Sequence, residues 1–163
     1  MKVFFSPQGG VSKELSRLIK AAKRKIDLAA YAFSSKYLGN ALATAQKRGI
    51  KIRVILDRDN ADQTYNIDEW LAAQGIEVRF IQVENGCMHH KFVIIDGKTL
   101  MTGSYNFTND SEYRNYEAAL FTGSSILIKA FATEFERLWL LSSAQSLPAL
   151  PSAKNPSPLR RCL

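Results

Sequence analysis

The sequence predicts an α/β fold, built as a mixed, mostly parallel β-sheet with helices on both faces. Three observations support this. Strand-like and helix-like segments alternate through the first half of the chain. Residues 26–33 are almost entirely apolar, as is usual for a strand covered on both sides. In the second half, Asp96-Gly97 separates two strand-like runs, which predicts a β-hairpin.

The elements of the first half follow from apolar spacing and breaker residues. Residues 2–5 predict a short strand, and residues 11–23 a helix with its apolar side chains on one face. The apolar run 26–33 predicts the next strand. Residues 37–48 predict a second helix, which ends at Gly49 because glycine is favoured just after a helix.

The remaining elements continue this pattern. A strand with alternating apolar residues is expected at 51–56, a polar loop at 57–60, a helix at 67–73 and a strand at 76–81. After the hairpin, the sequence predicts a strand at 117–121 and an amphipathic helix at 125–141, with Phe131, Phe135, Leu138 and Trp139 facing inward.

The chain has 163 residues, which suits one domain with its own hydrophobic core. We place this domain at residues 1–144. Four of the five prolines follow residue 145, and we expect residues 145–163 to form a basic, disordered tail. No internal repeat is visible, so a motif found once in the sequence occurs once in the fold.

The formal net charge is +7, and the tail contributes three positive charges through Lys154, Arg160 and Arg161. The remaining residues therefore carry +4 (7 − 3), so the basic character does not depend on the tail. A basic surface favours polyanionic partners, with nucleic acid first and anionic membrane second.

The N-terminus offers only three consecutive apolar residues, Val3 to Phe5. A signal peptide needs roughly seven or more, and a membrane span about twenty. We therefore expect no integral membrane segment. The protein is expected to be cytoplasmic if Met1 is its natural start, and periplasmic or secreted if an export signal has been removed.

The residues that suggest chemistry begin at His89 and form the pattern H-x-K-x4-D, with Lys91 and Asp96. In a strand, His89 and Lys91 project from the same face about 7 Å apart, so both can flank one phosphate. The hairpin should return Ser104 and Asn106 to the same end, where their side chains can bind phosphate oxygens.

A metal site is the competing interpretation, because Cys87 and His90 lie beside His89. His90, however, should point to the opposite face of the strand. The chain has only two histidines and two cysteines, so a zinc site would also need carboxylates. We expect neither a metal, nor another cofactor, nor a disulfide framework.

These residues resemble the signature of the phospholipase D superfamily, H-x-K-x4-D followed by G-S-x-N. The resemblance is strongest to its small bacterial endonuclease branch, the Nuc-like nucleases with one motif per chain, and it extends from Val3 to about Leu140. Asn115-Tyr116-Glu117 is similar to the Asn-x-Glu of that family.

The resemblance implies a role for each of these residues. It implies catalytic roles for His89 and Lys91, phosphate binding by Lys91, Ser104 and Asn106, and a Glu117 carboxylate that orients the histidine. Asp96 is included in the catalytic set as support for the site. Weaker candidates for substrate contacts are Arg58, Tyr105 and Arg114, because arginine and aromatic side chains can stack on bases.

The leading functional hypothesis is a metal-independent, sequence-nonspecific endonuclease that acts on DNA, with RNA left open, through a covalent phosphohistidine. One histidine cannot be both nucleophile and leaving-group acid in the same step, so a single motif per chain implies a homodimer. A phospholipase D or cardiolipin hydrolase is the first alternative, and a non-catalytic nucleic-acid-binding module is the second.

Overall fold

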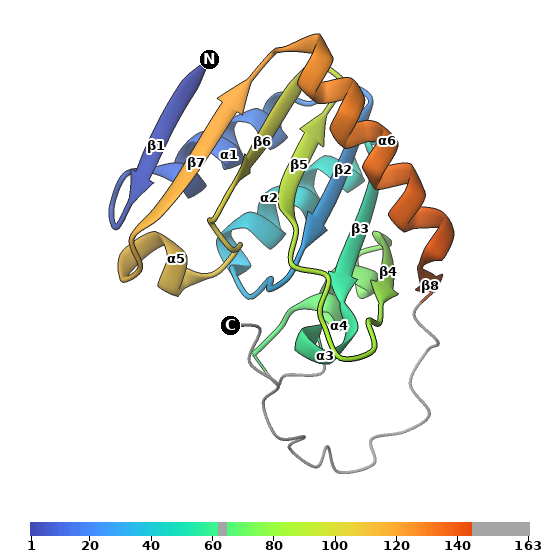
Figure 1. Ribbon diagram of the computed structural model, residues 1–163. Helices are drawn as coiled ribbons and strands as arrows, with labels where there is room; N and C mark the ends of the chain where they lie inside the picture. Colours follow the sequence, from blue (N-terminus) through green and yellow to red (C-terminus); the bar gives the residue numbers. More distant parts are fainter. Residues whose placement is uncertain (62–64, 145–163) are drawn as a thin grey trace.

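The computed structural model describes residues 1–61 and 65–144, which form one eight-stranded sheet with six helices (Figure 1). The elements, in chain order, are β1 (Lys2–Ser6), α1 (Val11–Ala21), β2 (Lys25–Ala30), α2 (Lys36–Lys47), β3 (Lys51–Asp57), α3 (Arg58–Ala61), α4 (Asp68–Ala73), β4 (Glu77–Ile81), β5 (Lys91–Ile95), β6 (Thr99–Gly103), α5 (Asn109–Tyr113), β7 (Glu117–Thr122), α6 (Ser125–Leu141) and β8 (Ser143–Ala144).

The strand order is β1-β7-β6-β5-β2-β3-β4-β8. The expectation of a mixed sheet is confirmed, but the expectation that it is mostly parallel is wrong. Only β2–β3 and β3–β4 pair in parallel, whereas the other five pairings described are antiparallel. Parallel pairs arise where helices connect successive strands. The β5–β6 hairpin instead places β5 antiparallel to β2. The periodicity of a sequence does not show which distant strand a hairpin will pair with.

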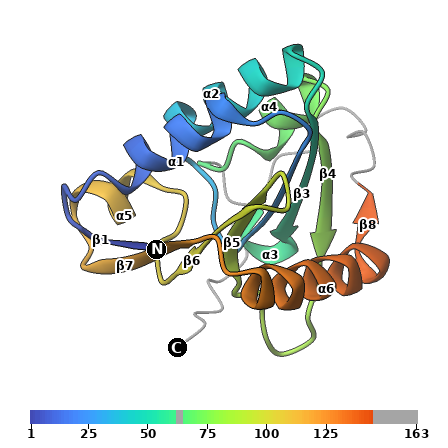
Figure 2. The same ribbon diagram turned by 90° about the horizontal axis from the view of Figure 1, so that it is seen from above.

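Helices cover both faces of the sheet, as expected (Figure 2). On one face, α1 buries Leu15 and Ile19 in a large core that includes much of α2 and the strands beneath it. On the other face, α6 packs Phe135 and Trp139 into a second core with Phe92 of β5. Strand β5 therefore lies between two hydrophobic layers, and this fixes the direction of each of its side chains.

Most predicted elements agree with the structure to within a few residues, and the differences are local. Strand β2 ends at Ala30 rather than residue 33, because the chain then leaves the sheet and Ser34 and Ser35 donate backbone hydrogen bonds to Phe107. Part of the predicted polar loop 57–60 is helix α3. The short elements α5 and β8 were not predicted. The predicted tail, 145–163, lies outside the described residues.

Candidate active site

Most of the predicted site residues come together at one edge of the sheet, drawn at the bottom of Figure 1. At this edge β2 and β6 end and β5 and β7 begin. Lys91 is the first residue of β5 and pairs with Ala30, the last residue of β2. We call this boundary, which carries His89, Lys91, Ser104, Asn106 and Glu117, the catalytic edge.

His89 and Lys91 share one face of the chain, as their spacing predicts. Both contact Tyr31: the imidazole lies 4.6 Å from the tyrosine ring, and Lys91 Nζ lies 5.1 Å from it, measured to ring centroids. Lys91 Nζ also donates a hydrogen bond to the backbone oxygen of His89 over 2.9 Å. Sequence analysis did not identify Tyr31, which packs against both key side chains.

His90 points the other way, toward α6. Its Nε2 lies 3.1 Å from a carboxylate oxygen of Glu134, and its ring packs against Phe92 of the second core. The imidazole is about half exposed, and it lies on the opposite side of the chain from His89, as alternation predicts. The two histidines of one chain therefore cannot meet at one phosphate.

The charges at the site favour a neutral histidine beside a cationic lysine. Desolvation and the charge of Lys91 lower the pKa of His89, and this is only partly opposed by Asp57. Burial lowers the pKa of Lys91 to about 8, against the opposing effect of Glu117. Near neutral pH, the imidazole can act as a nucleophile while the ammonium remains available to phosphate oxygens.

This lysine pKa leads to a testable prediction for substrate binding. In the His89→Ala background, which removes the imidazole, we expect oligonucleotide affinity to fall as the pH rises through about 8 and Lys91 loses its proton. Adding Lys91→Arg should flatten the profile, because guanidinium stays charged. Fluorescence anisotropy measures both curves, and identical slopes would contradict the assignment of Lys91 to phosphate binding.

Ser104 and Asn106 follow the hairpin, as predicted. Asp96 and Gly97 both have positive φ, which allows the tight turn between β5 and β6. Gly103 is required by close packing, since a Cβ atom there would lie 2.0 Å from the backbone oxygen of Ala118. Ser104 is exposed, and the buried carboxamide oxygen of Asn106 has no partner among the described residues. The Ser104 hydroxyl accepts a hydrogen bond from the backbone N–H of Ala118 over 3.1 Å and can donate its own proton to a phosphate oxygen. In Asn106 the group suited to a phosphate oxygen is the amide nitrogen, because the carboxamide oxygen only accepts.

Glu117 lies at the catalytic edge, but its described contacts differ from those expected. Its carboxylate accepts a hydrogen bond from Asn115 over 3.3 Å and interacts electrostatically with Lys91. Within the described chain, no hydrogen bond joins it to His89. Its predicted role as the orienting group therefore stays a prediction.

Asp57 is a carboxylate near His89 that sequence analysis treated only as part of a loop. It is buried at the end of β3, and burial raises its pKa. Its two oxygens accept backbone hydrogen bonds, one from Met88 over 2.8 Å and one from Asn60 over 2.9 Å. Because Met88 precedes His89, Asp57 anchors the segment that presents the imidazole.

The assignment of Asp96 to the catalytic set is wrong. It lies in the hairpin turn at the opposite end of β5, about 20 Å from His89 by strand length. Its carboxylate accepts backbone hydrogen bonds from Lys23, Arg24 and Lys25 over 2.8–3.0 Å. Asp96 thus fixes the hairpin to the start of β2, which is a structural task.

The three residues predicted to contact the substrate lie in different surroundings. Tyr105 is fully buried, and its hydroxyl donates to Glu112 over 2.7 Å, so its assignment as a substrate contact is wrong. Arg58 lies just after β3 with its guanidinium 3.8 Å above the Phe80 ring. Arg114 is exposed and pairs with Asp110 over 2.9 Å. The roles of both arginines stay predictions.

The competing interpretation of this segment was a metal site at Cys87 and the two histidines. No group of three or more histidine, cysteine, aspartate or glutamate side chains in the described part of the chain could hold an ion. Cys162 lies outside the described residues.

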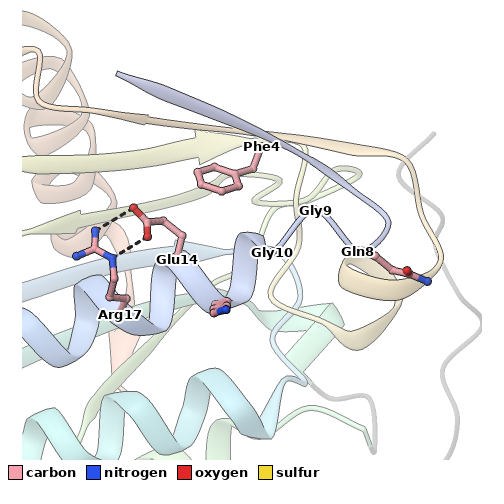
Figure 3. A pocket seen from close by; sticks show the side chains of 7 residues that line it. Phe4, Gln8, Gly9, Gly10, Glu14 and Arg17 are labelled. Carbon is pink, nitrogen blue, oxygen red and sulfur yellow. Dashed lines mark hydrogen bonds and ion pairs between the residues drawn. The ribbon is translucent and has the colours of Figure 1, made fainter.

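A separate pocket lies between β1 and α1, and none of the catalytic edge residues is among those that line it (Figure 3). Phe4 and the Glu14–Arg17 ion pair are among the residues that line it. The adjacent start of α1 is already occupied by protein, because Ser12 donates its backbone hydrogen bond to Glu112. One backbone N–H of this helix terminus is therefore already bound by a carboxylate of the protein.

Comparisons with known proteins agree with this arrangement. Residues 15–139 match the family model described as "Cardiolipin synthase, PLD-like domain". The chain is 40% identical over 128 residues to the human protein named mitochondrial cardiolipin hydrolase, covering 77% of this chain and 50% of that protein. It is 35% identical over 127 residues to a protein named phospholipase D from Rickettsia conorii, covering 78% and 63%.

The similarity extends to solved structures. The phospholipase D family member Nuc from Salmonella typhimurium superimposes with a TM-score of 0.82 at 28% identity, covering 88% of this chain and 96% of that one. By contrast, the chain spans about half to two thirds of the length of the mitochondrial cardiolipin hydrolases that it matches. The family match covers most of the described domain, and the chain belongs to the phospholipase D superfamily.

Proposed function

We propose that this protein is a metal-independent phosphodiesterase that works through a covalent phosphohistidine. The observation that carries the proposal is the His89–Lys91 pair, which shares one face at the open catalytic edge and packs against Tyr31. The lowered pKa of His89 favours a free imidazole nitrogen, and Lys91 supplies a positive charge at the same place.

The first chemical step forms a bond between an imidazole nitrogen and phosphorus and breaks the bond from phosphorus to the leaving oxygen. Lys91, Ser104 and Asn106 are suited to bind the non-bridging oxygens as their negative charge increases. The leaving oxygen takes a proton from a second acid. Water then attacks phosphorus, the nitrogen–phosphorus bond breaks, and the same group that gave the proton receives one from the water.

Within one chain, His90 faces α6 and is not placed to be the second acid. We therefore propose a homodimer in which His89 of the partner subunit donates this proton. Such a composite site is symmetric, so either imidazole can serve as nucleophile. The exposed position of His89 leaves room for a second subunit at the catalytic edge.

We propose nucleic acid, and DNA in particular, as the substrate. The resemblance to the small one-motif endonucleases supports this choice, as do four exposed tyrosines. These residues lie in segments that begin or end at the catalytic edge: Tyr37, Tyr65, Tyr113 and Tyr116. Exposed aromatic rings beside a phosphate site can stack on bases.

A phospholipid substrate is the second candidate, and the names of the similar proteins favour it. The human relative is named a cardiolipin hydrolase, and the matched family model carries cardiolipin synthase in its description. The described residues contain no helix that could span a membrane.

A substrate panel tests the proposal. Purified protein should cleave plasmid or single-stranded DNA equally well with and without EDTA, because Lys91 rather than a metal stabilises the charge. Cardiolipin and phosphatidylcholine in detergent micelles should stay intact. Loss of cleavage in EDTA with recovery on adding Mg²⁺ would contradict the metal-independent mechanism, whereas hydrolysis of cardiolipin alone would replace DNA with lipid.

A further inference from the structure

A cluster of basic residues lies at the end of the sheet opposite the catalytic edge. We call it the distal basic edge, and it consists of Lys20, Lys23, Arg24, Lys47, Lys51 and Lys98, all exposed. Hydrogen bonds bring these segments together. Lys51 donates its backbone hydrogen bond to Arg24, and the Asp96 carboxylate binds the backbone of Lys23 and Arg24 beside the turn that carries Lys98. Arg48 joins the ends of α1 and α2 by donating to the backbone oxygen of Lys20.

The distal basic edge accounts for the positive charge of the domain. Residues outside the tail carry +4, obtained from 19 basic (22 − 3) and 15 acidic residues. The six residues of the edge contribute +6, so the rest of residues 1–144 sums to −2 (4 − 6). None of the six side chains forms an ion pair with a described residue. Two of the six also interact in other ways: the Arg24 guanidinium donates to the backbone oxygen of Asp96, and the charge of Lys51 acts on Glu136. All six side chains are exposed, so their charge can still act on a partner.

This charge is too far away to bind the phosphate held at the catalytic edge. The two edges are separated by the length of β5 and its flanking residues, about 20 Å. Exposed charges are screened beyond about 8 Å at physiological ionic strength. The distal basic edge is therefore a surface of its own.

Neighbouring apolar residues indicate which polyanion this surface fits. Ile126 is 81% exposed and Leu127 39% exposed at the start of α6, which follows directly from Gly123 beside Lys98. In Figure 1, this start of α6 and the β5–β6 turn lie together at the top of the molecule. Basic side chains beside exposed aliphatic ones are typical of surfaces that bind anionic membranes.

The position of the aromatic residues argues against nucleic acid at this surface. The exposed tyrosines lie in segments at the catalytic edge, and no residue of the distal basic edge is flanked in sequence by an aromatic residue. A surface for single-stranded nucleic acid would combine positive charge with aromatic stacking platforms. Here the two features are at opposite ends of the sheet.

We propose that the distal basic edge docks on an anionic phospholipid surface, with Ile126 and Leu127 entering the headgroup region. The catalytic edge then points away from the bilayer, toward soluble substrates. The proposal goes beyond the proposed function and does not depend on it, because docking requires no catalytic residue and can be measured by binding alone.

Vesicle sedimentation tests the docking. The full chain should bind vesicles of phosphatidylcholine mixed with phosphatidylglycerol and not vesicles of phosphatidylcholine alone. Lys23→Glu with Lys51→Glu should weaken binding by roughly thirtyfold, since each lysine near an anionic surface contributes about fivefold. The matched control is Lys13→Glu with Lys36→Glu, which makes the same change in net charge at exposed lysines elsewhere and should bind nearly as well as the parent chain.

The controls keep docking separate from folding and catalysis. Circular dichroism and thermal unfolding confirm that both double variants fold, and both keep residues 145–163. Equal weakening by the two double variants would show that net charge alone matters and would overturn the proposal. It would also be overturned if, in the His89→Ala background, the distal variant lost oligonucleotide affinity while its vesicle binding was unchanged. Failure of DNA cleavage would affect only the proposed function.

Discussion

Replacement of His89 by alanine is expected to abolish turnover, with a loss of roughly four orders of magnitude or more, because the variant has no group that can form the bond to phosphorus. The imidazole is exposed at the catalytic edge, so its removal leaves no large cavity. Folding and oligonucleotide binding should therefore be retained. Single-turnover cleavage assays, thermal unfolding and anisotropy measure the three quantities.

His90→Ala provides the matched control, because it removes the neighbouring imidazole on the other side of the chain. His90 is half exposed and contacts Glu134, so its loss should cost little stability and change activity by no more than a few-fold. If His89→Ala and His90→Ala both fold well and lose activity to a similar degree, His90 takes part in the reaction and the assignment of catalysis to His89 alone is wrong.

Mixing wild-type and His89→Ala chains in equal amounts is expected to leave about one quarter of the dimers active by random pairing. Each mixed dimer would hold one imidazole at its composite site, so either the nucleophile or the leaving-group acid would be missing. Two differently tagged chains allow the mixed dimer to be isolated and assayed directly. Sedimentation measures the assembly state of the same samples.

Two outcomes would contradict the shared site. An active monomer would show that one chain contains every group the reaction needs. A mixed dimer with half the wild-type activity would show two independent sites. In either case another proton donor would have to act near His89, and Tyr31 and Asp57 would be the first residues to test because both interact with it.

The parts of the site that depend on local geometry could be predicted from the sequence. Alternation along a strand placed His89 and Lys91 on one face and His90 on the other. The Asp96-Gly97 turn correctly predicted that the chain would return toward Ser104. These predictions need only residues that are close in sequence.

The parts that depend on long-range packing could not be predicted. Tyr105 was predicted to contact the substrate, whereas it is buried and its hydroxyl donates to Glu112 of α5. Asp57 is more than thirty positions from Met88 in the sequence, yet it holds the segment before His89. Sequence spacing contains no information about which distant segments meet, and the mostly parallel sheet was predicted wrongly for the same reason.

The position of Asp96 changes how the motif should be read in other chains. Lys91 and Asp96 bracket β5, so the four intervening residues of H-x-K-x4-D measure one strand crossing the sheet. The motif thus places the catalytic histidine and lysine at one end of β5 and, at the other end, an aspartate that only holds the hairpin to β2. A related protein that keeps the aspartate and its turn but lacks the histidine and the lysine should have the same fold and no phosphodiesterase activity. Conversely, a chain with an asparagine at the turn could remain a competent enzyme.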